Sequence, residues 1–95
     1  MRGEERRDPR ELEKVKVTVK GTRSNGVSFE EQTESVDLSM LGLSFYLRTP
    51  ISVRTFLSIE IGESRLLFHI RKAKVLVVRI DTSSPGKQLV GVQFL

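Results

Sequence analysis

The chain has 95 residues, with 16 Lys and Arg against 12 Asp and Glu, a formal net charge of +4, one His and no Cys. These numbers fit one small domain, and they exclude a disulfide framework, a thiolate metal site, a catalytic thiol and a His-rich metal site. No apolar run approaches the roughly 20 residues of a membrane span, and residues 1–14 are too charged for a signal peptide, so we expect a soluble, cytoplasmic protein without membrane insertion.

Residues 1–13 show no apolar periodicity, and we interpret them as a flexible, Arg-rich N-terminal arm. Residues 14–95 form the predicted domain. Its first strand is indicated by Val15, Val17 and Val19, which alternate with polar residues at the period of a half-buried strand.

A turn is predicted at residues 24–26, because the Asn-Gly pair within Ser-Asn-Gly tolerates positive φ. A second strand follows over residues 27–36. Polar and apolar residues alternate poorly in this segment, so one face of the strand must be exposed to solvent. Residues 37–42 are predicted to interrupt the strands, and residues 43–47 alternate again as a short third strand.

A fourth strand is predicted over residues 56–61. Residues 65–80 form the longest β-rich run, and 16 residues is long for one strand. We therefore expect a bulge or bend at residues 71–74, within a single fifth strand. A Ser-Pro-Gly loop at residues 81–86 leads to the last strand, residues 89–95.

These patterns predict an all-β fold of six short antiparallel strands with no strong helix pattern. A sandwich and a barrel both suit the spacing, and a six-stranded antiparallel barrel is favoured because a small barrel closes its own edges. We expect it to carry an extended N-terminal arm and no C-terminal helix. Charge is uneven, with +3 in residues 1–23, −4 in residues 24–63 and +5 in residues 64–95. The two basic ends could meet and attract an anion, or could be solvated faces.

Two short segments carry candidate binding chemistry. Asp37, Ser39 and Gly42 combine a carboxylate, a hydroxyl and a bare backbone, which suits a flat heterocycle with N–H donors such as guanine. Arg6 and Arg10 stand four residues apart, and guanidinium groups bind phosphate bidentately and contact guanine. The structural alternatives are a self-bonded turn and a frayed, inconsequential chain end.

Together the two segments resemble the PilZ domain family. An Arg-x-x-x-Arg motif at Arg6 and Arg10 precedes the first strand, and an Asp-x-Ser-x-x-Gly motif follows at residues 37–42. The apolar run at residues 75–79 and the terminal Leu-Val-Gly-Val-Gln-Phe at residues 89–94 look like the last two strands of that fold. The resemblance covers essentially the whole chain, and order and spacing make it more specific than either motif alone.

The resemblance implies a PilZ-like barrel that binds cyclic di-GMP, a bacterial second messenger. By residue, it implies that Arg6 and Arg10 hold the phosphates and contact the guanines. Asp37 would accept hydrogen bonds from a guanine edge, Ser39 would bond the same base or its phosphate, and Gly42 would let the base lie close to the backbone. Arg7, between the two arginines, is an expected extra phosphate contact.

Three details qualify the carried-over motif. Arg2 and Arg6 are also four residues apart, so a register one turn earlier stays open, although Arg10 leaves the better connection to the first strand. Leu41 stands where many members have Gly. His69, placed within the fifth strand, is interpreted as a packed or rim residue, because no partner motif accompanies it.

The leading hypothesis is therefore a non-enzymatic cyclic di-GMP receptor, with no catalytic residue, metal or cofactor, whose arm becomes ordered on ligand binding and signals to an unknown protein partner. One rival is a PilZ-like barrel that binds no nucleotide and serves as a protein-interaction module. Another is a small nucleic-acid-binding barrel, which the sequence pI of 9.9 favours. No strand interleaves basic and aromatic residues, which argues against nucleic acid.

Overall fold

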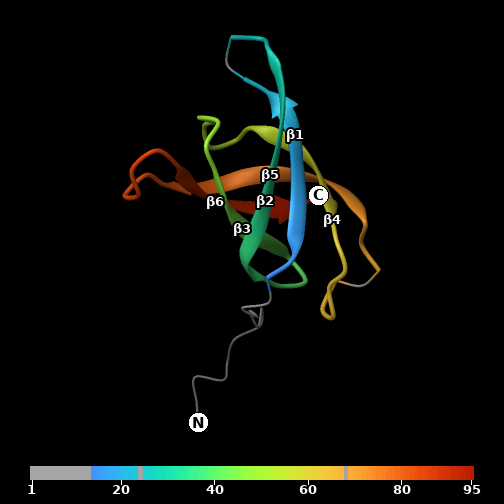
Figure 1. Cartoon of the computed structure of the whole chain (residues 1–95). Helices are drawn as coiled ribbons and strands as arrows, with labels where there is room; N and C mark the ends of the chain where they lie inside the picture. The colour runs from blue at the N-terminus through green and yellow to red at the C-terminus, as the bar shows by residue number, and fades with distance from the viewer. Residues whose placement is uncertain (1–13, 24, 68) are drawn as a thin grey trace.

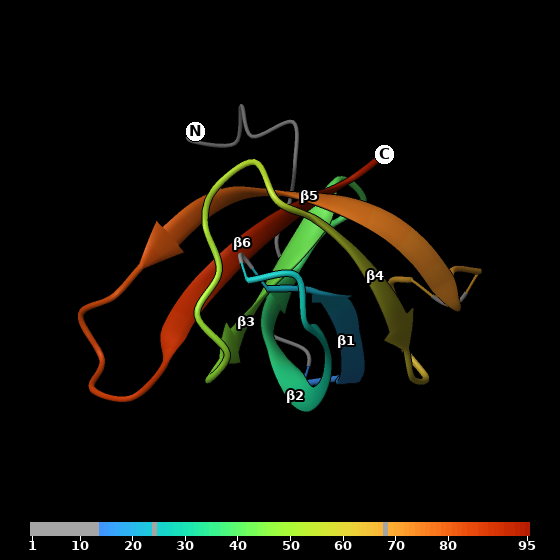
Figure 2. The same cartoon turned by 90° about the horizontal axis from the view of Figure 1, so that it is seen from above.

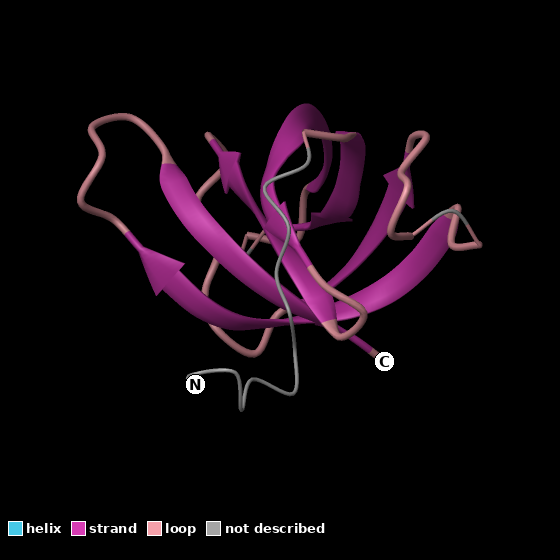
Figure 3. Cartoon of the chain, turned by 90° about the horizontal axis from the view of Figure 1, so that it is seen from below, coloured by secondary structure: helices cyan, strands magenta, loops and turns pink. Residues whose placement is uncertain are grey.

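The structure is a computed structural model that describes residues 14–95 except residues 24 and 68 (Figure 1). Six strands and no helix are present in these described residues (Figure 3). The strands are β1 (Lys16–Thr22), β2 (Ser28–Leu38), β3 (Gly42–Leu47), β4 (Phe56–Ile61), β5 (Lys72–Asp81) and β6 (Gln88–Phe94).

The strands close into an antiparallel barrel in the order β1-β2-β3-β6-β5-β4, with β4 pairing back to β1. Figure 2 shows the strands curving around a common interior. The predicted six-stranded antiparallel barrel is confirmed. A closed barrel lets a chain this short bury an apolar interior without covering helices, because each strand contributes alternate side chains to one shared core.

Among the described residues, the fully buried core consists of aliphatic side chains and the ring of Phe45. On β1, Val17 and Val19 are buried while Lys16 and Lys20 on either side of them are exposed, as the period-two pattern predicts. Phe45 is the largest fully buried side chain. The core comprises Val15, Val17, Val19, Leu38, Leu43, Phe45, Leu47, Leu57, Ile59, Ile61, Leu67, Val75, Val77, Val90 and Val92.

The predicted turn between the first two strands is confirmed at its described residues. Gly26 has φ of +86°, a conformation that favours glycine, and its N–H donates to the Arg23 carbonyl at 2.9 Å. The Asn25 side chain accepts from the Val27 N–H at 3.0 Å. The local sequence thus specifies this hairpin without help from the core.

The predicted single strand over residues 65–80 is wrong in its first part, because β5 begins at Lys72 and the preceding residues form a loop. Ser64 Oγ accepts from the Leu67 N–H at 2.9 Å, and the Ile70 N–H donates to the Leu67 carbonyl at 2.9 Å. These turns direct Leu67 into the core, where it is fully buried. His69 therefore lies in an exposed loop and not in a strand.

The irregular positions of the strands also differ from the prediction. Pairing of β5 with β4 is continuous through residues 72–76, so the bulge expected at residues 71–74 is absent from that described pairing. Register shifts occur instead between Val77 and Arg79 on β5 and between Ser35 and Asp37 on β2. A bulge re-aims side chains and increases local twist, which a small barrel needs in order to close.

Candidate functional site

The interruption predicted at residues 37–42 is shorter in the structure. β2 ends at Leu38 and β3 begins at Gly42, so three residues, 39–41, form the turn between them. Ser39 organises this turn: its N–H donates to the Gly42 carbonyl at 2.8 Å, and its Oγ accepts from the N–H groups of Leu41 at 3.1 Å and Gly42 at 3.3 Å. The Ser39 side chain is fully buried. Its hydroxyl stabilises the turn that holds the motif.

Asp37 lies beside the bulge of β2 and is half-buried. Its Oδ1 accepts a hydrogen bond from Ser44 Oγ at 2.8 Å, and the backbone of the two residues is paired between β2 and β3. Ser44 is buried on the outer side of β3, because Leu43 and Phe45 on either side point into the core. The hydroxyl therefore fixes the orientation of the carboxylate.

The sequence interpretation missed Ser44. A signal was present, since Ser44 is the one small polar residue between the two apolar residues of the third strand and so had to face outward. Its partner could not be identified without the strand register, because Asp37 and Ser44 become neighbours only when β2 pairs with β3 across the bulge.

Gly42 lies where the backbone of β3 comes close to that of β6. A Cβ built on Gly42 would overlap the Val92 carbonyl oxygen and would lie 3.1 Å from the Gln93 Cα. The missing side chain thus allows the Gly42–Gln93 pairing of β3 with β6. The close contact with the β6 backbone thus explains why residue 42 is a glycine.

The N-terminal end of the described chain joins the barrel next to this turn. The Val15 N–H donates to Ser35 Oγ at 2.9 Å, and the Ser35 N–H donates to the Val15 carbonyl at 2.8 Å. Ser35 lies two residues before Asp37 on β2. Arg6, Arg7 and Arg10 lie outside the described residues.

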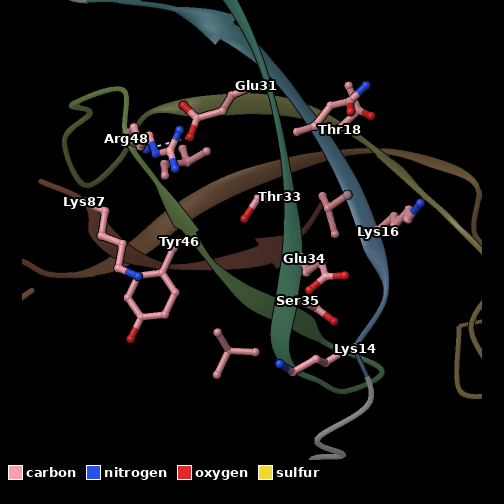
Figure 4. A pocket seen from close by; sticks show the side chains of 14 residues that line it. Lys14, Lys16, Thr18, Glu31, Thr33, Glu34, Ser35, Tyr46, Arg48 and Lys87 are labelled. Atoms are coloured by element: carbon pink, nitrogen blue, oxygen red, sulfur yellow. Dashed lines mark hydrogen bonds between the residues drawn. The ribbon is translucent and has the colours of Figure 1, made fainter.

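A groove of about 1020 Å³ adjoins the same end and lies where β2 and β3 diverge (Figure 4). Four of its residues are basic, namely Lys14, Lys16, Arg48 and Lys87. Lys87 Nζ lies 4.3 Å from the ring centroid of Tyr46 in a cation–π contact. The complete lining is Lys14, Lys16, Val17, Thr18, Glu31, Gln32, Thr33, Glu34, Ser35, Val36, Tyr46, Leu47, Arg48 and Lys87.

At the end of the groove away from Lys14, the Glu31 carboxylate links β2 to the residues that follow β3. Glu31 accepts hydrogen bonds from the Arg48 N–H at 2.7 Å, the Thr49 N–H at 3.0 Å and the Thr49 hydroxyl at 2.8 Å. The lining carries four basic side chains and two acidic ones, Glu31 and Glu34, so its formal charge is positive. The groove therefore presents positive charge, an aromatic ring and polar backbone, which suit an anion that carries flat rings.

Across residues 14–23, 25–67 and 69–95, the structure has no helix with the length and apolar character needed to cross a bilayer. In the same stretches, no group of three or more His, Asp or Glu side chains is arranged to hold a metal ion.

No protein-family model matches the sequence, and no curated protein sequence matches it. Among solved structures, the chain is similar to the K. pneumonia MrkH–c-di-GMP complex, with a TM-score of 0.62 and 19% sequence identity. The match covers 97% of this chain and 45% of that chain, so this chain spans less than half the length of its structural neighbour. At this identity the likeness establishes a shared fold. The closed barrel of six antiparallel strands is therefore a PilZ-like barrel.

Proposed function

We propose that the chain is a cyclic di-GMP receptor domain of the PilZ family, in which residues 1–13 form a ligand-binding arm and residues 14–95 form the barrel. One observation carries the proposal: the chain joins the barrel at Val15, hydrogen-bonded to Ser35, beside the turn that follows Asp37. The described chain therefore begins at the end of the barrel that carries Asp37, and the proposal assigns the preceding Arg motif to the same ligand. The fold likeness to a protein solved with c-di-GMP supports the same ligand class.

In the proposed site, the arm supplies charge and the barrel supplies base recognition. Arg6, Arg7 and Arg10 neutralise the two phosphates and contact the guanines, because guanidinium groups bind phosphate bidentately and contact flat rings. The Asp37 carboxylate, oriented by Ser44, accepts from the N–H groups of a guanine edge. Ser39 and Gly42 shape the turn that presents this carboxylate.

The proposed activity is recognition without catalysis, followed by ordering of the arm. Ligand phosphates would hold the arm against the barrel, and a protein partner would bind the surface so formed. Because the ligand is a bacterial second messenger, the proposal implies a bacterial, cytoplasmic protein.

We expect backbone amides of residues 2–11 to exchange more slowly with solvent deuterium when cyclic di-GMP is bound, because arm arginines then contact phosphate. Amides of the packed strands should change little. Hydrogen exchange measured with and without the nucleotide tests this step. Equal exchange of residues 2–11 in both states, at saturating ligand, would contradict arm ordering.

A second candidate is a PilZ-like barrel that binds no nucleotide and serves as a protein-interaction module. The buried hydroxyl of Ser39 favours it, because that hydroxyl and the backbone at Gly42 are accounted for by contacts inside the fold. In that case the motif persists for structural reasons and the groove binds a protein segment.

Isothermal titration with cyclic di-GMP separates the two candidates, with GTP as the control ligand. The wild-type chain should bind cyclic di-GMP, and Asp37→Ala should lower the affinity by about 10-fold to 100-fold, since a hydrogen bond to a charged group contributes about 1.5–3 kcal/mol. The matched control is Glu60→Gln, an exposed acid on β4. Absence of wild-type binding would favour the interaction module, and equal loss in both variants would remove Asp37 from the site.

A further inference from the structure

Four residues lie in one row across the outer face of four neighbouring strands. Asp37 on β2 pairs with Ser44 on β3, Ser44 pairs with Gly91 on β6, and Gly91 pairs with Arg79 on β5. Residues directly opposite each other in paired strands point to the same face of the sheet. We call these four residues the cross-strand row.

Both ends of the cross-strand row lean toward its middle. Asp37 is drawn over β3 by the 2.8 Å hydrogen bond from Ser44. At the other end, the Arg79 guanidinium lies over Gly91, where a built Cβ would be 3.1 Å from a terminal guanidinium nitrogen and 3.2 Å from the guanidinium carbon. The guanidinium occupies the space that a side chain at position 91 would fill.

The middle of the cross-strand row is nearly flat. Ser44 has a small side chain and Gly91 has none, and both are buried, with the Arg79 guanidinium over Gly91 and the Asp37 carboxylate bonded to Ser44. Neighbouring strands lie about 4.8 Å apart, and the guanidinium leans from β5 onto β6, so the two charged groups are separated by about two strand spacings or less. A planar heterocycle placed over the cross-strand row would lie within reach of both groups.

Arg79 is exposed, although an acidic residue, Asp81, lies on the same strand. Asp81, two residues further on β5, accepts a hydrogen bond from the Ser83 N–H at 2.9 Å. Hydrogen bonds from Ser83 are the main cause of the lowered pKa of Asp81, and the positive charge of Arg79 adds a smaller contribution. The Asp81 carboxylate is thus engaged by the loop after β5.

We infer that Arg79 reads the same guanine base as Asp37, from the opposite side of the cross-strand row. The inference rests on the proposed function. Guanine offers N–H donors on one edge, which suit the carboxylate, and the acceptors O6 and N7 on the adjacent edge, which suit a bidentate guanidinium. Adenine carries an amino donor in place of O6, so both ends of the row discriminate against it.

The test is titration of the full chain with cyclic di-GMP and with cyclic di-AMP. Arg79→Ala should weaken cyclic di-GMP binding by about 10-fold to 100-fold, and the preference for the guanine over the adenine dinucleotide should fall by a similar factor. Arg79→Lys retains the charge but not the planar guanidinium group. Its preference for the guanine over the adenine dinucleotide should therefore be as low as that of Arg79→Ala. Arg23→Ala is the matched control, because Arg23 is an exposed arginine in the turn between β1 and β2.

Gly91→Ala gives an independent test that leaves every arginine in place. The added methyl would meet only the far end of the Arg79 side chain within 3.4 Å, so the guanidinium should move while the barrel stays folded. We expect the guanine preference to fall as in Arg79→Ala, with a melting temperature within a few degrees of the wild type.

The outcomes separate this inference from the proposed function. If the wild type binds cyclic di-GMP and Asp37→Ala weakens it, while Arg79→Ala behaves like Arg23→Ala with an unchanged guanine preference, then Arg79 is a packing residue and the inference is overturned. If the wild type binds neither dinucleotide, the proposed function fails and the role of Arg79 fails with it.

Discussion

Gly42→Ala should lower the free energy of unfolding by about 3 kcal/mol, at the upper end of the usual cost of overpacking. The new methyl group would overlap the Val92 carbonyl oxygen and would lie 3.0 Å from the Val92 carbonyl carbon. These atoms are backbone, and they cannot move without disturbing the pairing of β3 with β6. Urea unfolding followed by circular dichroism measures the loss as a lower midpoint.

Gly62→Ala is the matched control for this prediction. A methyl group there would lie 3.4 Å from the nearest atom, the Lys16 carbonyl oxygen, which is an ordinary contact distance. Its unfolding midpoint should stay close to that of the wild type. Equal midpoints for the Gly42 and Gly62 variants would show that β3 and β6 can separate without loss, contrary to the close approach described above.

Arg6→Ala and Arg10→Ala should each weaken cyclic di-GMP binding by about 1.5–3 kcal/mol, because each removes a charge-assisted contact with phosphate or guanine. Arg7→Ala should have a smaller effect, as an added phosphate contact. The melting temperature of the free protein should not change, because the predicted arm has almost no apolar side chain to bury. Isothermal titration and thermal unfolding measure the two quantities.

Arg2→Ala tests the register of the Arg motif, since Arg2 and Arg6 have the same spacing as Arg6 and Arg10. It should bind like the wild type. A larger loss for Arg2→Ala than for Arg10→Ala would move the motif one turn earlier in the chain. Unchanged binding in all the arginine variants would place the nucleotide away from the arm.

Alternation identified the strands wherever one face of a strand is core and the other is solvent. Residues 56–61, predicted as the fourth strand, are the observed β4, and the valines of β1 are buried as expected. The same reasoning failed at residues 65–71, where apolar side chains alternate but the backbone turns through Ser64 and Leu67. A loop that sends a side chain such as Leu67 into the core also needs apolar residues, so composition does not distinguish it from a strand.

The candidate site was predictable as a set of residue types but not as an arrangement. Asp37 and the glycine at position 42 were identified from spacing, whereas Ser44 and Arg79 join Asp37 only through the register of four strands. Two of these pairings adjoin bulges, and a shift of one residue would turn the side chains to the other face. Hydrophobic patterning does not specify where such bulges fall, and this limited the prediction.

The glutamates of β2 have a consequence for self-association. Pairing of β2 with β3 begins at Ser35, while residues 28–34 pair with β1 on one side, so the other side of this stretch is an open strand edge in the barrel wall. Open edges template pairing with further chains. Glu30, Glu31 and Glu34 would bring like charges together if two copies met along this edge. The acidic residues that disturb the alternation of this strand therefore disfavour edge-to-edge pairing of two copies along the groove.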